Sequence, residues 1–84
     1  MENKVTRLES GFAYSCVTMD GCVMVAIVDE RVKGTTSPVA MVANVPVEAV
    51  DSVVSRAIHL YRDHQIISLA GNVDEFNGTF SKVA

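Results

Sequence analysis

Several features of nucleic-acid-binding proteins are missing from this sequence. It has no tryptophan, and aromatic residues make up 6% of the chain. Its seven lysines and arginines are scattered among ten acidic residues, which gives a net charge of −3. Nucleic-acid binding depends on clustered positive charge and, for single strands, on aromatic stacking surfaces. We therefore do not expect nucleic acid as a partner.

Long apolar runs are also missing. No segment approaches the roughly 18 consecutive apolar residues that a transmembrane helix needs. The first residues, Met1–Lys4, are not followed by an apolar run of the kind found in signal peptides. We expect a cytoplasmic protein that does not associate with a membrane.

Residue patterns typical of catalysis or metal binding are scarce. Cys16 and Cys22 have no neighbouring base in the sequence that would activate a thiol. His59 and Asp63 are four residues apart on a predicted helix, but two ligands are too few for a protein metal site. His64 is interpreted as a capping residue at the end of that helix. We expect neither an enzyme nor a cofactor or metal site.

The composition is that of one small folded domain. The chain has 84 residues, of which 49% are hydrophobic, chiefly valine, alanine, isoleucine and methionine. A chain of this length forms one core rather than two, so residues 1–84 are assigned to a single domain. Residues 1–10 have no clear periodicity and are interpreted as a flexible arm or a lead-in strand.

The strongest local signal is the pair Asp20-Gly21. It separates two runs rich in β-forming residues, 11–19 and 22–28. An Asp-Gly pair in this setting is typical of a two-residue hairpin turn, because both central residues of that turn need a positive φ. In the resulting register, Met19 lies opposite Cys22.

This register divides the hairpin into two faces, because alternate residues of a strand point to opposite sides. Neither face is polar. One face carries Phe12, Tyr14, Cys16, Thr18, Val23, Val25 and Ile27. The other carries Ala13, Ser15, Val17, Met19, Cys22, Met24, Ala26 and Val28.

The rest of the chain predicts one helix and further strands. An amphipathic helix is expected from about Pro46 to His64, with Asn44 or Val45 as its cap. Strands are expected at Val39–Ala43, at Gln65–Ala70 and, after a turn at Asn77-Gly78, at Thr79–Val83. The fold class is α+β: a small mixed or antiparallel sheet, made of the hairpin and two or three further strands, with one helix packed on one face, in the order β-β-β-α-β(-β).

One helix can cover only one face of the sheet, which leaves the second apolar face of the hairpin to be explained. We expect an interface there, formed by Val17, Met19, Met24 and Val28. Its occupant is expected to be another copy of the chain in a dimer, with a different protein or the terminal segments as alternatives. A register shifted by one residue, or a sheet curled on itself, would remove the need for any occupant.

These observations favour a non-catalytic protein–protein interaction module. Adaptors, regulators and inhibitors belong to this class, as do phage- or plasmid-encoded antagonists of host systems. The alternative is a small-ligand or nucleotide-binding domain, with its pocket between sheet and helix or at a subunit interface. Tyr14, Met24 and Met41 are expected to line this pocket. Polar contacts to the ligand are expected from Arg31, Thr35 and Thr36.

Overall fold

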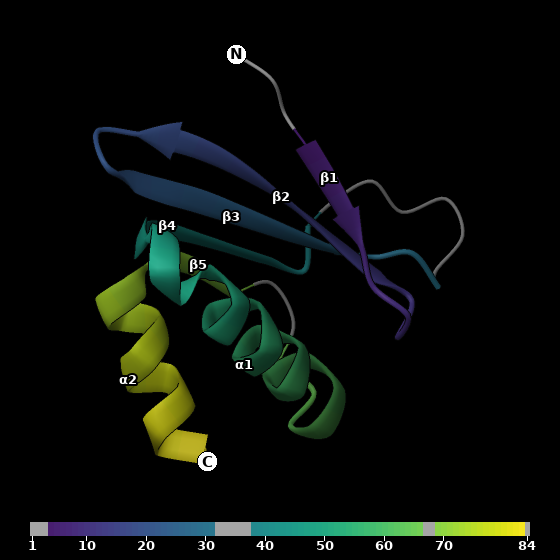
Figure 1. The fold of residues 1–84 in the computed structure, drawn as a ribbon. Helices are drawn as coiled ribbons and strands as arrows, with labels where there is room; N and C mark the ends of the chain where they lie inside the picture. The colour runs from purple at the N-terminus through teal and green to yellow at the C-terminus, as the bar shows by residue number, and fades with distance from the viewer. Residues whose placement is uncertain (1–3, 32–37, 67–68, 84) are drawn as a thin grey trace.

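In the described part of the chain, a five-stranded sheet carries both α-helices on the same face (Figure 1). The computed structural model describes residues 4–31, 38–66 and 69–83. In chain order the elements are β1 (Lys4–Arg7), β2 (Phe12–Met19), β3 (Cys22–Asp29), β4 (Ala40–Pro46), a 3₁₀ turn η1 (Val47–Ala49), α1 (Val50–Asp63), β5 (Leu69–Asn72) and α2 (Val73–Val83). The sheet order is β1-β2-β3-β4-β5, antiparallel except for the parallel pair β4–β5. The predicted α+β class with a mixed sheet is confirmed.

The hairpin has the predicted turn and register. Asp20 and Gly21 both have positive φ, 49° and 81°, as the two-residue turn requires. Met19 pairs with Cys22, and the pairing continues without a shift to the far end of both strands. Because the register is unshifted, the division of the hairpin into two faces is as expected.

A β-bulge in β4 lets this strand bury two valines on one face. Val42 pairs with Val25 and Val45 with Val23, so one extra residue of β4 is accommodated between the two pairs. Asn44 takes the left-handed conformation with φ of 58°, which asparagine tolerates better than most residues. As a result Val42 and Val45, three residues apart, are both fully buried on the helix side.

The core lies between the sheet and α1, which contacts β3 and β4. Four residues of α1 are buried at helical spacing: Val53, Val54, Ala57 and Leu60. The predicted helix is therefore present, but its start is shifted: residues 47–49 form η1, and α1 begins at Val50. Asn44 and Val45 belong to β4 instead of forming a helix cap, because the bulge uses the special conformation of Asn44.

The C-terminal segment is a helix, and the predicted turn and edge strand there are wrong. α2 runs through Asn77-Gly78 and packs on β4, β5 and α1. The side chain of Asn72 accepts a hydrogen bond from the backbone N–H of Glu75 at 2.9 Å, as a helix N-cap residue does. Phe76, four residues from Phe80, supplies the buried contact of the helix. The capping signal and this spacing outweigh the turn propensity of Asn-Gly.

The strand predicted at Gln65–Ala70 lies later in the chain. β5 spans Leu69–Asn72 and follows β4 in parallel, after the α1 crossover. Gln65 has a positive φ of 53° immediately after α1, so the chain changes direction there before the strand begins. Residues 67–68, inside the predicted strand, lie outside the described residues.

Gly78 provides a test of the helical assignment of α2. It is exposed in the helix, and a methyl group added at its Cα meets nothing within 4 Å. We expect Gly78→Ala to raise the free energy of unfolding by about 1 kcal/mol, because alanine is the better helix former. Urea denaturation monitored by circular dichroism measures the change.

The matched control is Gly21→Ala. This glycine is also in open space, but its φ of 81° is strained for alanine. We expect this variant to lose about 1 kcal/mol of stability. A loss of stability in Gly78→Ala as well would contradict the helix and restore the Asn-Gly turn.

Candidate functional site

The face of the sheet opposite the helices is apolar and carries no helix among the described residues. We call it the open face and define it by Val5, Val17, Met24, Ala26, Val28 and Met41, which share one side by the strand register. Val5 is 56% exposed and Met41 38% exposed, while Val17, Met24 and Val28 are half-buried. A shallow depression of about 260 Å³ on this side is bordered by Val5, Ala26 and Val28.

The open face contains three of the four predicted interface residues, Val17, Met24 and Val28. The fourth, Met19, occupies a position on the same face by its pairing with Cys22. Among the described strand residues, Arg7 is the one charged position on this side. Arg7 lies on the edge strand, and its Nε is 3.3 Å from a carboxylate oxygen of Glu30. The face therefore presents almost no net charge.

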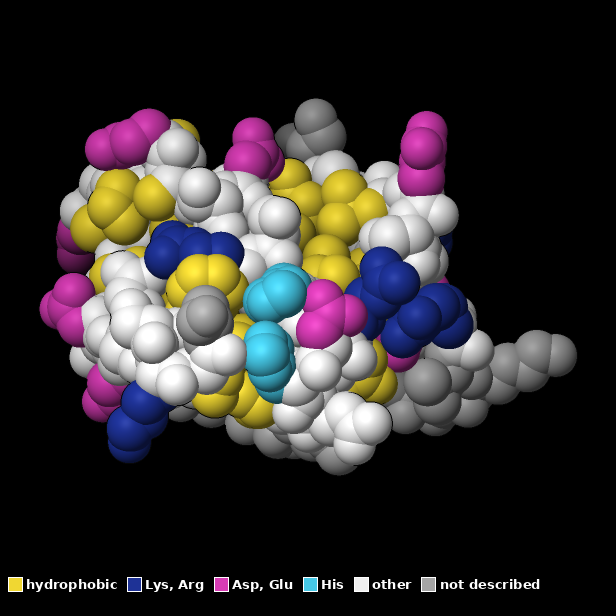
Figure 2. All heavy atoms as spheres, turned by 90° about the horizontal axis from the view of Figure 1, so that it is seen from below, with side chains coloured by type: hydrophobic (Ala, Val, Ile, Leu, Met, Phe, Trp, Pro, Cys, Tyr) yellow, Lys and Arg dark blue, Asp and Glu magenta, His cyan; other side chains and the backbone are white. Residues whose placement is uncertain are grey.

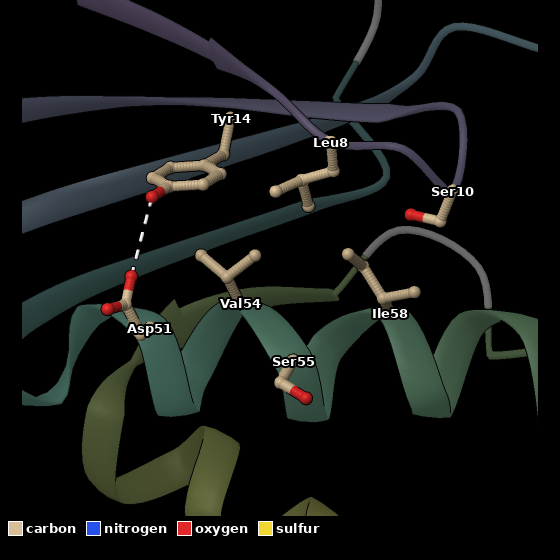
Figure 3. Close-up of a pocket in the computed structure, with 7 residues that line it drawn as sticks. All are labelled: Leu8, Ser10, Tyr14, Asp51, Val54, Ser55 and Ile58. Atoms are coloured by element: carbon tan, nitrogen blue, oxygen red, sulfur yellow. Dashed lines mark hydrogen bonds between the residues drawn. The ribbon is translucent and has the colours of Figure 1, made fainter.

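A second hollow lies on the other side of the sheet, between β1–β2 and α1 (Figure 3). It has a volume of about 370 Å³. The cleft remains although β2 contacts α1 through Phe12 and Tyr61, whose rings pack edge-to-face with 5.8 Å between their centres. Its lining combines apolar and hydroxyl or carboxylate side chains: Leu8, Ser10, Tyr14, Asp51, Val54, Ser55 and Ile58.

Two polar groups meet across the mouth of this cleft. The Tyr14 hydroxyl points from β2 toward α1 and donates a long, 3.5 Å hydrogen bond to Asp51 Oδ1 (Figure 3). Cys16 lies on the same face of β2, and burial, followed by the negative charge of Asp51, raises the pKa of its thiol. A raised pKa lowers the thiolate fraction at neutral pH, so Cys16 is a poor nucleophile here. Cys16 and Cys22 are both free thiols.

The structure separates most of the predicted ligand contacts. Tyr14 lines the cleft, whereas Met24 and Met41 lie on the opposite face of the sheet and cannot line the same sheet–helix pocket. Thr35 and Thr36 lie outside the described residues. Asp51, in the first turn of α1, is the carboxylate that faces the cleft.

Arg31, the remaining predicted ligand contact, is engaged by Asp29. Arg31 donates its backbone N–H and Nε to Asp29 Oδ1, at 3.0 and 2.8 Å, and its Nη2 to Oδ2 at 2.9 Å. Its guanidinium carbon also lies 4.6 Å from the centre of the Phe12 ring. Gly11 leaves room for this arrangement, since a Cβ at that position would be 2.6 Å from Arg31 Cγ.

Asp29 carries a buried carboxylate. It is 2% exposed and ends β3 on the helix side. The hydrogen bonds from Arg31 lower the pKa of Asp29 to about 2, against the opposing effect of burial. A hydrogen bond to the same carboxylate raises the pKa of the Tyr61 hydroxyl in α1. Alternation from Val25 through Ile27 already places Asp29 inward, and an inward carboxylate needs a cation nearby.

The predicted helical pair of His59 and Asp63 is confirmed, with Nδ1 and Oδ2 2.8 Å apart. His64 is the C-cap residue of α1, as predicted, and its backbone N–H donates to the Leu60 carbonyl oxygen. Within the described residues, no group of three or more histidine, cysteine, aspartate or glutamate side chains is arranged to hold a metal ion.

Comparison with known proteins does not identify a relative. No family model matches the sequence, and no significant match is found among curated proteins or solved structures. Of the helices in the described ranges, none has the length and apolar character needed to cross a membrane.

The Asp29–Arg31 pair predicts a specific acid sensitivity. The pKa of Asp29 in the folded protein, about 2, lies below its ordinary value of 3.8, so the pair stabilises the fold above about pH 4 and loses this contribution as the pH falls toward 2. Because Arg31 is half-exposed, we expect a contribution of about 1–2 kcal/mol. Urea denaturation between pH 6 and about pH 2 measures it.

Asp29→Asn should remove this part of the pH dependence and destabilise the protein by about 1–3 kcal/mol at pH 7. The neighbouring Glu30→Gln is the control, because Glu30 makes only an exposed pair and should cost less than about 1 kcal/mol. Equal effects of the two substitutions would show that Asp29 has no special role.

Proposed function

We propose that this protein is a non-catalytic interaction module that associates through the open face of its sheet, with a second copy of the chain as the occupant. The observation that carries the proposal is the placement of both helices on one side, which leaves an apolar, nearly uncharged sheet surface on the other. Soluble proteins seldom expose such surfaces unless they bind something. Regulators and inhibitors that act by covering a surface of another protein belong to the same class of function.

Charge leaves the open face as the surface through which two copies of the chain can meet. The whole chain carries a net charge of −3, so two copies repel each other through most of their surfaces. On the open face the described strands carry one charged position, Arg7, at the edge. Two open faces can therefore meet without burying like charges, and a two-fold axis is the commonest symmetry for such a contact.

The size of the open face sets the expected strength of the contact. With about 4.8 Å between strands and about 3.3 Å per residue, five strands of these lengths span at most about 500 Å². Part of this surface is already covered, since Ala13 lies on the open face by register and is fully buried. Two copies packed face to face would cover at most about 1,000 Å² in total, the lower limit for a specific interface. We therefore expect a reversible dimer with a dissociation constant in the micromolar range.

A matched pair of substitutions tests the use of this face. Val5 and Val47 are both exposed valines, at 56% and 59%, but Val5 lies on the open face and Val47 in η1, outside the sheet. We expect Val5→Asp to raise the dissociation constant of the dimer at least tenfold, because each copy places a charge in the contact. Val47→Asp should leave it unchanged. Sedimentation velocity over a concentration series measures both.

Val17→Asp, nearer the middle of the sheet, should weaken the dimer further. Thermal denaturation first establishes that this half-buried position tolerates the change. A wild-type protein that stays monomeric at several hundred micromolar rules out the second copy as occupant. A folded Val17→Asp variant that still dimerises would rule out the open face.

The cleft beneath β1–β2 supports a second candidate function, the binding of a small ligand. Its volume of about 370 Å³ lies in the range of small-molecule sites, and its apolar lining has a few polar groups. Asp51 would repel phosphate, so the lining favours a neutral or cationic ligand with an apolar body over a nucleotide.

Ile58→Trp tests this alternative by filling the cleft. A specific ligand should raise the melting temperature of the wild-type protein by mass action and leave that of the variant unchanged. Ile58→Leu serves as the control that preserves the cleft. Equal shifts in Ile58→Trp and wild type for every ligand found in a thermal-shift panel would contradict a site in the cleft.

A further inference from the structure

The two histidines of the chain lie together at the surface on the helix side (Figure 2). His59 is in the last turns of α1, and His64 caps the end of the same helix. Their Nε2 atoms are 3.3 Å apart. The ring of Phe80 in α2 packs edge-on against His59, with 5.8 Å between the ring centres, which restricts the orientation of the imidazole.

The geometry of the pair matches that of two ligands on one tetrahedral metal ion. With zinc–nitrogen bonds of about 2.05 Å, a nitrogen–nitrogen distance of 3.3 Å gives an angle of about 107° at the metal, close to tetrahedral. The same arrangement places the ring centres about 5.1 Å apart if each ring lies in line with its metal bond. The observed separation is 5.0 Å. The same two nitrogens form a hydrogen bond, in which the donor depends on the tautomer of each ring.

Asp63 favours the tautomer of His59 that metal binding through Nε2 requires. Its carboxylate lies 2.8 Å from Nδ1 of His59 and favours the tautomer that carries the proton on this nitrogen. The lone pair is then on Nε2, which is the atom that faces His64. A carboxylate behind a ligating histidine is a recurring feature of protein zinc sites. From the sequence, His59 and Asp63 are rejected as a ligand pair, and in the structure Asp63 lies behind His59 in an orienting position.

We infer that His59 and His64 together bind a divalent transition metal ion of the zinc class through their Nε2 atoms. Imidazole nitrogens are suitable zinc ligands, and their 3.3 Å separation is compatible with tetrahedral coordination. The sequence predicts no metal site, because two ligands are too few for a structural or catalytic one; this pair also supplies only two ligands, and water completes the coordination of a weak site. The site is therefore open and exchangeable, in contrast to the closed four-ligand sites that hold structural zinc. It is independent of the open face and of the cleft.

Titration of the full-length protein with Zn²⁺ at pH 7.5 tests the inference. Isothermal titration calorimetry gives the affinity, and long-range ¹H–¹⁵N spectra of the imidazoles show which ring nitrogen binds. We expect one zinc per chain and a shift of both Nε2 resonances. His59→Gln and His64→Asn should each lower the affinity at least tenfold, and both exposed positions tolerate a polar amide.

Asp63→Asn should weaken binding about tenfold while leaving both Nε2 atoms as ligands. Asp74→Asn, which changes an exposed carboxylate at the start of α2, is the matched control and should have no effect. Zinc binding of equal affinity in His64→Asn and wild type would overturn the inference. So would zinc-dependent shifts confined to one histidine.

Discussion

The two-residue turn at Asp20-Gly21 is the constraint on which the rest of the structure depends. It fixes the register of β2 against β3, and the alternation of the strands then fixes the face of every side chain in the hairpin. One face becomes the floor of the core, and the other becomes the open face. A shift by one residue would exchange the two sets, placing Met24 under α1 and Val25 outside.

The later elements complete one side of this sheet. The bulge at Asn44 turns both buried valines of β4 toward the helices, and the α1 crossover brings β5 alongside β4. Both helices then lie over β3, β4 and β5. In this one-sided arrangement a cleft facing Asp51 remains between β1–β2 and α1, and the opposite surface of the sheet carries no helix of the described chain.

The sequence allowed the hairpin, the buried face of α1 and the apolar second face to be predicted, because each depends on local periodicity and one unambiguous turn. It did not allow α2 to be predicted, because Asn77-Gly78 resembles a turn, a preference that the cap at Asn72 and the burial of Phe76 outweigh. The burial of Asp29 depends on its contact with Arg31, which lies beyond the end of the strand. The approach of His64 to His59 depends on how the chain leaves α1, which no periodic pattern encodes.

The central claim is that the open face is covered by a second copy. Methionine methyl NMR with a soluble paramagnetic probe tests it most directly, because Met24 and Met41 both lie on that face. We expect weak broadening of both methyl signals at high protein concentration, where the second copy covers them, and strong broadening on dilution. The methyl signals of Ile58, which lies in the cleft on the other side of the sheet, are observed as the control, and their broadening should not depend on protein concentration. Strong broadening of both methionines at every concentration would contradict the claim.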